Sequence, residues 1–123
     1  MILVDTSVWV DYLRSGNAVL SQLLQQSCVV VHPMIVGELA CGNLKNRNEL
    51  LKLLSALSPV IEASHAEVMH VIKHHALMGM GVGFVDMHLL TSCLLTGHTQ
   101  FWTRDKRLAR VAESLGIVYS EAH

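Results

Sequence analysis

The chain begins with the stretch ILVDTSVW, residues 2–9, in which a short apolar run ends at an acidic residue. Ile2–Val4 predicts a β-strand, and the spacing of Val8 and Tyr12 indicates a helix over residues 7–13. A strand that leads directly into a helix is the repeating unit of parallel sheets. This first unit therefore favours an α/β fold.

The same alternation continues along the chain. Ser64 followed by Glu67 forms a capping box that starts one of the later helices, and a glycine-rich joint over residues 79–83 precedes the next one. We expect one domain over residues 1–123, a three-layer α/β/α sandwich around a parallel sheet of about five strands. Further helices are expected at 18–26, 34–41, 48–57, 64–78, 85–95 and 105–115, and strands at 28–31, 59–61, 100–103 and 117–119.

The composition indicates a folded, soluble protein that has partners. Hydrophobic residues make up 51% of the 123 residues and charged residues 15%. This balance excludes disorder and predicts more apolar surface than a monomer covers by itself. The net charge of −1 excludes a generally basic protein that coats nucleic acid. Because no targeting segment precedes the first strand and polar residues interrupt the longest uncharged stretch, residues 15–37, we expect a cytoplasmic protein without a membrane span.

The cysteines and histidines do not favour a disulfide or a zinc site. Cys28, Cys41 and Cys93 lie far apart among aliphatic residues and are interpreted as small core residues. His70 and His74 have the i, i+4 spacing of a zinc-binding pair, but the polar face of a helix explains them better.

Four acidic residues stand at the edges of apolar segments or inside them. Asp5 follows the first strand, Glu38 lies in the helix after the second strand, and Asp86 and Asp105 open helices. In parallel sheets, ligands bind beyond the carboxyl ends of the strands, where Asp5 and Thr103 both fall. The topology therefore allows the four acids to form one cluster.

Each acid also has a structural interpretation. Asp5 and Asp105 are suited to cap helices. Glu38 lies in a helix that is apolar nearly all round, and an unpaired buried carboxylate is costly, so it needs a partner or a metal. Asp86 needs a partner or a metal for the same reason, because its helix face is predicted to be buried. The buried stripe of that helix is predicted to be Leu89, Leu90 and Cys93, and the polar stripe His88, Thr91 and Ser92.

Several carboxylates in one poorly solvated site repel each other, which raises their pKa values unless a cation neutralises them. Mg²⁺ or Mn²⁺ suits such a site, because hard divalent ions prefer oxygen ligands and retain waters that can react. Zinc fits less well, since no histidine or cysteine accompanies the acids at ligand spacing. The four acids therefore indicate phosphoryl chemistry.

The segments around these acids resemble the ordered motifs of the PIN domain, and more narrowly those of VapC-type toxins. The motifs are VDTSVW with Asp5, IVGEL with Glu38, GFVDMHLL with Asp86, and FWTRDKRL with Thr103 and Asp105. The resemblance covers essentially the whole chain. It implies the toxin of a toxin–antitoxin pair, a metal-dependent endoribonuclease that dimerises and is inhibited by a small VapB-like antitoxin.

Carried onto this chain, the resemblance implies that Asp5, Glu38, Asp86 and Asp105 hold Mg²⁺ or Mn²⁺, with Asp5 as the central ligand. Water activated by the cation would then hydrolyse RNA phosphodiester bonds. The hydroxyls expected to orient carboxylates or waters belong to Thr6 or Ser7 and Thr103.

The RNA contact is predicted from a basic group around the last acid, with a solvated helix face as an equally good interpretation of each residue. The group consists of Arg104, Lys106, Arg107 and Arg110. Trp9 and Trp102 are expected in the core. Two alternative functions remain: a noncatalytic PIN-fold module that binds RNA or protein, and a metal-dependent phosphatase. The phosphatase is less favoured, because a second Asp is needed two residues after Asp5, where this chain has Ser7.

Overall fold

A computed structural model describes residues 1–121. Its centre is a sheet of four parallel strands in the order β3-β2-β1-β4. Leu3 in β1 pairs with Val30 in β2 on one side and Phe101 in β4 on the other. The strands are β1 (Ile2–Val4), β2 (Val29–Val31), β3 (Ser58–Pro59) and β4 (Gln100–Trp102).

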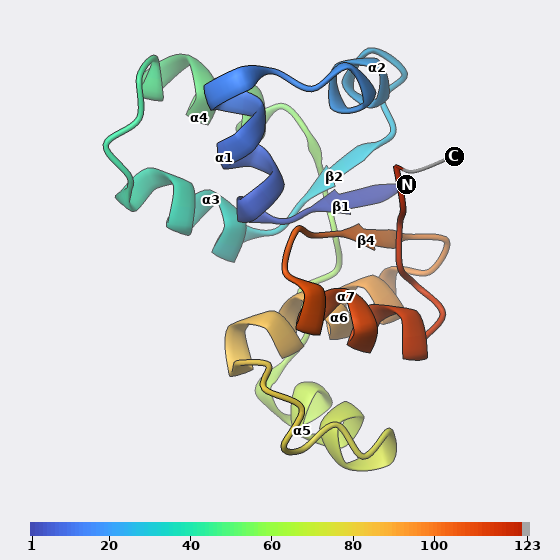
Figure 1. Ribbon diagram of the computed structural model, residues 1–123. Helices are drawn as coiled ribbons and strands as arrows, with labels where there is room; N and C mark the ends of the chain where they lie inside the picture. Colours follow the sequence, from blue (N-terminus) through green and yellow to red (C-terminus); the bar gives the residue numbers. More distant parts are fainter. Residues whose placement is uncertain (122–123) are drawn as a thin grey trace.

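Helices cover both faces of this sheet, which confirms the predicted α/β sandwich. In Figure 1, α1, α2 and α4 lie above the strands, α6 and α7 lie below them, and α5 lies outside α6. The α3 helix packs against α1 and α4. The helices are α1 (Thr6–Ser15), α2 (Ala18–Gln25), α3 (Pro33–Cys41), α4 (Arg47–Ser55), α5 (His65–His74), α6 (Phe84–Thr96) and α7 (Lys106–Ser114).

The two inner strands are buried on both faces because helices cover both sides. All residues of β1 and β2 are buried, and the core includes both tryptophans, as predicted. Uninterrupted apolar runs such as residues 2–4 and 29–31 are typical of strands in this position. Of the three cysteines, Cys93 is buried as predicted, whereas Cys41 is exposed and Cys28 is partly covered.

The sheet has four strands, so the prediction of about five was wrong. The expected last strand, residues 117–119, makes a single bridge between Val118 and Phe101. The N–H of Phe101 donates to the carbonyl of Ile117 at 2.7 Å, and the N–H of Tyr119 donates to the carbonyl of Phe101 at 2.9 Å. This pairing involves one residue of β4 only, which is too short to form a strand.

The α5–α6 region differs from the prediction in detail. The capping box of Ser64 and Glu67 is present, but α5 ends at His74 rather than near residue 78. The predicted polar stripe of α6 was wrong, because Thr91 and Ser92 are fully buried. The Ser92 hydroxyl accepts from the N–H of Ala63 at 3.1 Å. Since α5 covers the outer side of α6, α6 has apolar surroundings on two sides, and local spacing cannot indicate this.

None of the helices within residues 1–121 is both long enough and apolar enough to cross a membrane.

Candidate active site

Asp5 is held by hydroxyl groups at the carboxyl end of the sheet. It is 8% exposed and occupies the cap position of α1, yet its side chain makes no capping hydrogen bond. Its Oδ2 accepts instead from the hydroxyl of Ser7 at 2.8 Å and from that of Thr103 at 2.7 Å. Thr103 is next to Asp5 because β1 and β4 are paired, with Val4 opposite Trp102. Asp5 therefore stands at the cap position of α1, as the structural interpretation expected, but its side chain does not cap the helix.

Asp105 is linked to Asp5 through the same threonine. The N–H of Asp105 donates to Thr103 Oγ1 at 3.1 Å. Asp105 also caps α7 as predicted, because its Oδ1 accepts from the N–H groups of Arg107 at 2.9 Å and Leu108 at 3.1 Å. Capping engages one carboxylate oxygen, so Oδ2 stays available to a ligand.

Glu38 joins the site from α3 but is not buried. The helix buries Ile35 and Leu39, whereas Glu38 is exposed. The prediction that Glu38 is buried, which rested on its apolar neighbours, was therefore wrong. The hydroxyl of Thr6 donates to Glu38 Oε1 at 2.9 Å. The sequence left open whether Thr6 or Ser7 orients a carboxylate; in the structure Thr6 contacts Glu38 and Ser7 contacts Asp5.

Asp86 lies in the first turn of α6 and is half-buried. Burial raises its pKa to about 6, and the negative charges of Asp5, Glu38 and Asp105 act in the same direction, while a contact with the backbone of Gly83 opposes them. Three segments distant in sequence therefore bring their carboxylates within electrostatic reach of Asp86. The four predicted acids form one cluster, and no side-chain cation is among the groups that shift this pKa.

The cluster offers the donor atoms of a hard cation. Asp5, Glu38 and Asp105 each engage one oxygen in a hydrogen bond with the protein and keep the other. All four groups are carboxylates, which Mg²⁺ and Mn²⁺ prefer over nitrogen or sulfur ligands. As they are placed, however, no three histidine, cysteine, aspartate or glutamate side chains in residues 1–121 are arranged to hold a metal ion. The donor type fits, and the side chains must converge further to enclose an ion.

Comparison with known proteins identifies the family. The sequence from residue 2 to residue 114 matches the PIN domain family. The chain belongs to this family. It is 41% identical over 121 residues to Ribonuclease VapC32 of Mycobacterium tuberculosis H37Rv, with 98% of each chain covered, and equally to Ribonuclease VapC32 of strain CDC 1551 / Oshkosh. The resemblance to the VapC-type members of the PIN domain family is thereby confirmed.

A solved structure supports the PIN fold independently of close sequence identity. The structure of FitAB bound to an IR36 DNA fragment aligns with a TM-score of 0.63 and 18% identity, over 100% of both chains. At this identity, the likeness bears on the fold alone.

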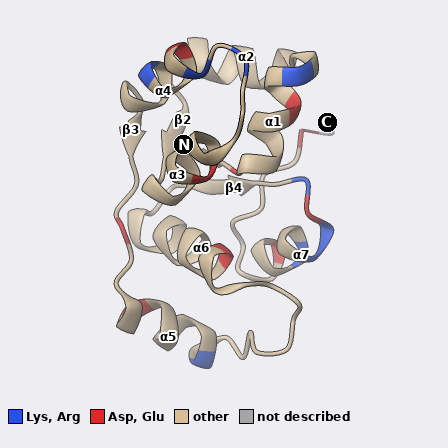
Figure 2. Ribbon diagram, turned by 90° about the vertical axis from the view of Figure 1, so that its left-hand side faces the viewer, with Lys and Arg blue, Asp and Glu red and all other residues tan. Residues whose placement is uncertain are grey.

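In the described part of the chain, the basic group that follows β4 contains one arginine that is ion-paired and three basic side chains that are not. Figure 2 shows Lys and Arg at the turn from β4 into α7. Arg104 forms ion pairs with Asp11 at 3.3 Å and with Glu121. Within the described residues, Lys106, Arg107 and Arg110 are exposed and form no ion pair. The sequence ranked these four residues equally, because neither carboxylate that pairs with Arg104 is close to it in sequence.

The raised pKa of Asp86 predicts a pH-dependent effect of Asp86→Asn. The ordinary pKa is 3.8, and the value in the folded PIN domain is about 6. The folded protein therefore binds this proton more tightly than the unfolded chain does. The resulting stabilisation is fully present below pH 3.8 and is lost as the pH rises through about 6. Asp86→Asn removes the charge, so in EDTA we expect it to raise the free energy of unfolding at about pH 8 but not at about pH 3.5.

Urea unfolding at both pH values measures this difference, with Glu113→Gln on the exposed side of α7 as the matched control. If Asp86→Asn changes the free energy of unfolding equally at the two pH values, the charge of Asp86 does not destabilise the folded protein.

Proposed function

We propose that the protein is the toxin of a VapBC-like toxin–antitoxin pair, an endoribonuclease that hydrolyses RNA with Mg²⁺ or Mn²⁺ at the four-carboxylate cluster. The observation that carries this proposal is the electrostatic contact of Asp86 with Asp5, Glu38 and Asp105. A carboxylate whose pKa is raised by burial and by neighbouring carboxylates, as that of Asp86 is, becomes more stable in its ionised form when a cation binds among them. The identity to Ribonuclease VapC32 over nearly the whole chain supports RNA as the substrate.

Each protein group has a defined task in this mechanism. Asp5 is the central ligand, because Ser7 and Thr103 fix its Oδ2 and leave Oδ1 to the cation. Glu38, held by Thr6, and Asp105, held by its cap bonds, present their remaining oxygens. Asp86 would supply the fourth carboxylate, and a bound cation would stabilise its ionised form. When bound, the cation lowers the pKa of a coordinated water and stabilises negative charge on the phosphate.

Hydrolysis by activated water predicts specific products. The purified protein is expected to cut single-stranded RNA internally when Mg²⁺ or Mn²⁺ is present, to leave 5′-phosphate and 3′-hydroxyl ends, and to stop in EDTA. Gel analysis with labelled RNA and sequencing of the ends measures all three properties. Cleavage that continues in EDTA, or 2′,3′-cyclic phosphate ends, would contradict metal-dependent hydrolysis. Since RNA is the proposed substrate, we infer a cytoplasmic location.

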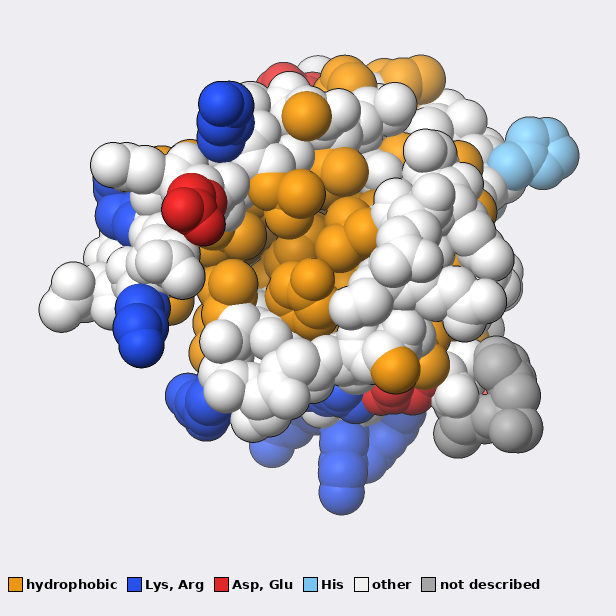
Figure 3. Space-filling model, turned by 90° about the horizontal axis from the view of Figure 1, so that it is seen from above, with side chains coloured by type: hydrophobic (Ala, Val, Ile, Leu, Met, Phe, Trp, Pro, Cys, Tyr) orange, Lys and Arg blue, Asp and Glu red, His pale blue; other side chains and the backbone are white. Residues whose placement is uncertain are grey.

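The antitoxin is proposed to place an apolar segment on the face that carries α1, α2 and α4. Figure 3 shows hydrophobic side chains gathered in a hollow on this face, with Lys and Arg and also an acidic side chain at its margin. Arg14 and Lys45 contribute to that margin, so acidic residues beside the apolar segment would complement it. Calorimetry with the partner protein tests this proposal. The apolar side chains that line the hollow between α1 and α4 include Val10, Tyr12, Leu13, Leu44, Leu50 and Leu53.

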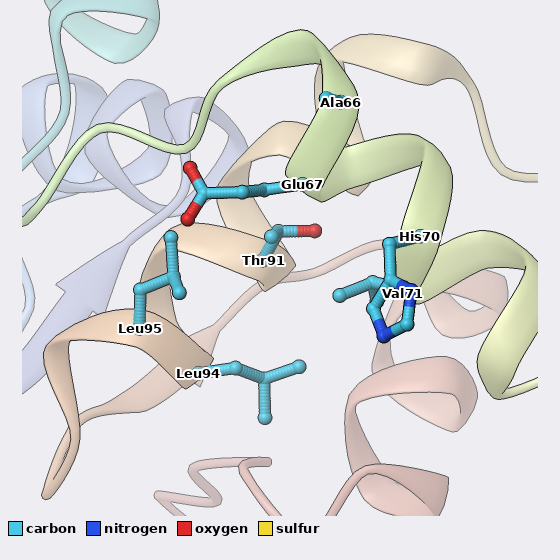
Figure 4. A pocket seen from close by; sticks show the side chains of 7 residues that line it. All are labelled: Ala66, Glu67, His70, Val71, Thr91, Leu94 and Leu95. Atoms are coloured by element: carbon cyan, nitrogen blue, oxygen red, sulfur yellow. The ribbon is translucent and has the colours of Figure 1, made fainter.

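A second copy of the chain is proposed to pack on the α5 side. Figure 4 shows that apolar side chains of α5 and α6, among them Val71, Leu94 and Leu95, line a hollow between the two helices. Light scattering is expected to give the mass of a dimer, and a monomer at micromolar concentration would contradict this. Of the ten exposed large hydrophobic side chains in residues 1–121, seven lie in this region: Ile61, Met69, Met78, Met80, Phe84, Val85 and Leu95.

A further inference from the structure

Arg107 lies against the backbone of the glycine-rich joint between α5 and α6. A methyl group added to Gly81 would lie 3.0 Å from both Cδ and Nη1 of Arg107, and 3.5 Å from its Cζ. Gly81 also has a φ of +75°, a left-handed conformation that glycine adopts without strain. Because residue 81 has no side chain, the side chain of Arg107 can pack directly against the backbone of the joint at this position.

The guanidinium of Arg107 is exposed, and no carboxylate among residues 1–121 neutralises it. Within residues 1–121 it forms no ion pair, whereas Arg104 is paired with both Asp11 and Glu121. A guanidinium presents N–H donors in a rigid fork that matches a phosphate. In this basic group, Arg107 has a charge that is unpaired within residues 1–121 and also contacts another segment of the chain, at Gly81.

This contact connects the two segments that supply Asp86 and Asp105. Gly81 precedes Gly83, the cap residue of α6, and Asp86 lies in the first turn of that helix. On the other side, the N–H of Arg107 donates to Asp105 Oδ1 at 2.9 Å. The guanidinium therefore lies beside the joint that leads into the Asp86 helix, and its residue belongs to the first turn of the helix that Asp105 caps.

Resting on the ribonuclease function proposed above, we propose that Arg107 binds an RNA phosphate next to the cleavage site and that Gly81 positions its guanidinium. The carboxylate cluster repels the RNA backbone until a cation is bound. Arg107 supplies a positive charge, unpaired among the described residues, from the first turn of the helix that Asp105 caps. The joint at residues 79–83 thus acts as a support for a substrate-binding side chain.

The test measures RNA affinity in a cleavage-deficient background. Single-stranded RNA is titrated between about 50 and 200 mM salt into Asp5→Asn protein, which is expected not to cleave and has one negative charge fewer in the cluster. Arg107→Ala is expected to weaken binding roughly tenfold and to reduce the slope of log K against log salt by about one. Lys52→Ala removes one exposed positive charge from α4, and we expect it to leave the affinity nearly unchanged.

Gly81→Ala tests the positioning role against a matched control. Gly79 lies in the same joint with a φ of +73°, but nothing lies within 4 Å of an added methyl group there. Both alanine variants carry the same backbone strain, so only the contact with Arg107 distinguishes them. Gly81→Ala is expected to weaken RNA binding more than Gly79→Ala, and to cause no further loss when Arg107 is already Ala.

The outcomes separate the two proposals. If wild-type protein cleaves RNA but Arg107→Ala keeps full affinity and the full salt slope, the phosphate role of Arg107 is wrong and the ribonuclease function stands. If Gly81→Ala and Gly79→Ala weaken binding equally, the positioning role of Gly81 is wrong. If wild-type protein neither binds nor cleaves RNA, both proposals are wrong. Arg107 is exposed, so Arg107→Ala gives a result even if Gly81→Ala does not fold.

Discussion

Replacing Asp5 by Asn is expected to abolish RNA cleavage while the fold stays intact. The amide oxygen can still accept the hydrogen bonds of Ser7 and Thr103, so the local geometry is kept. The negative charge that holds the cation is lost. A cation contributes several kcal/mol of transition-state stabilisation, which corresponds to a loss of roughly 10³-fold in rate. Single-turnover cleavage of labelled RNA measures this loss, and circular dichroism checks the fold.

Asp11→Asn is the matched control for this substitution. Asp11 lies in the same helix, α1, but pairs with Arg104 rather than with the cluster. We expect this variant to cleave RNA at nearly the wild-type rate. If Asp5→Asn cleaves as fast as Asp11→Asn does, Asp5 is not the central ligand.

Replacing Thr103 by Val is expected to lower the cleavage rate by about 10- to 100-fold, the usual cost of losing a group that orients a metal ligand. Valine has the shape of threonine but no hydroxyl. The change removes the 2.7 Å hydrogen bond to Asp5 Oδ2 and leaves the N–H of Asp105 without its acceptor at 3.1 Å. Because Asp5 is less well oriented, the Mg²⁺ concentration for half-maximal rate should rise.

Thr103→Ser keeps the hydroxyl and is expected to restore most of the activity, with a Mg²⁺ requirement close to that of the wild type. A Val variant with an unchanged rate and an unchanged Mg²⁺ requirement would mean that Thr103 serves the fold alone. Measuring the rate over a series of Mg²⁺ concentrations distinguishes these outcomes.

The sequence predicted the parts of the site that depend on local order along the chain. Asp5 and Thr103 each follow an apolar run, and parallel strands bring such positions to one edge of the sheet. Asp105 was predicted to cap a helix, and it does so while it also contacts Thr103. Strand-then-helix order and cap chemistry are local properties, so a single sequence contains them.

Properties that depend on neighbouring elements could not be predicted in the same way. Glu38 was expected to be buried because its helix is apolar, but α3 leaves the Glu38 side exposed. Thr91 and Ser92 were expected on the surface, but α5 covers them. The ion pair of Arg104 with Glu121 joins residues 17 positions apart, and the contact of Gly81 with Arg107 has no local pattern. Burial and charge pairing are set by tertiary packing, which periodicity does not encode.

The central claim is that four carboxylates form one cation site, and paramagnetic Mn²⁺ tests it most directly. Mn²⁺ added below stoichiometric amounts to isotope-labelled protein broadens the NMR signals of nuclei close to the bound ion. We predict that the signals around Asp5, Glu38, Asp86 and Asp105 broaden together, and that Asp5→Asn removes the effect. Broadening confined to the surface histidines His70 and His74, with the acidic cluster unaffected, would contradict the account.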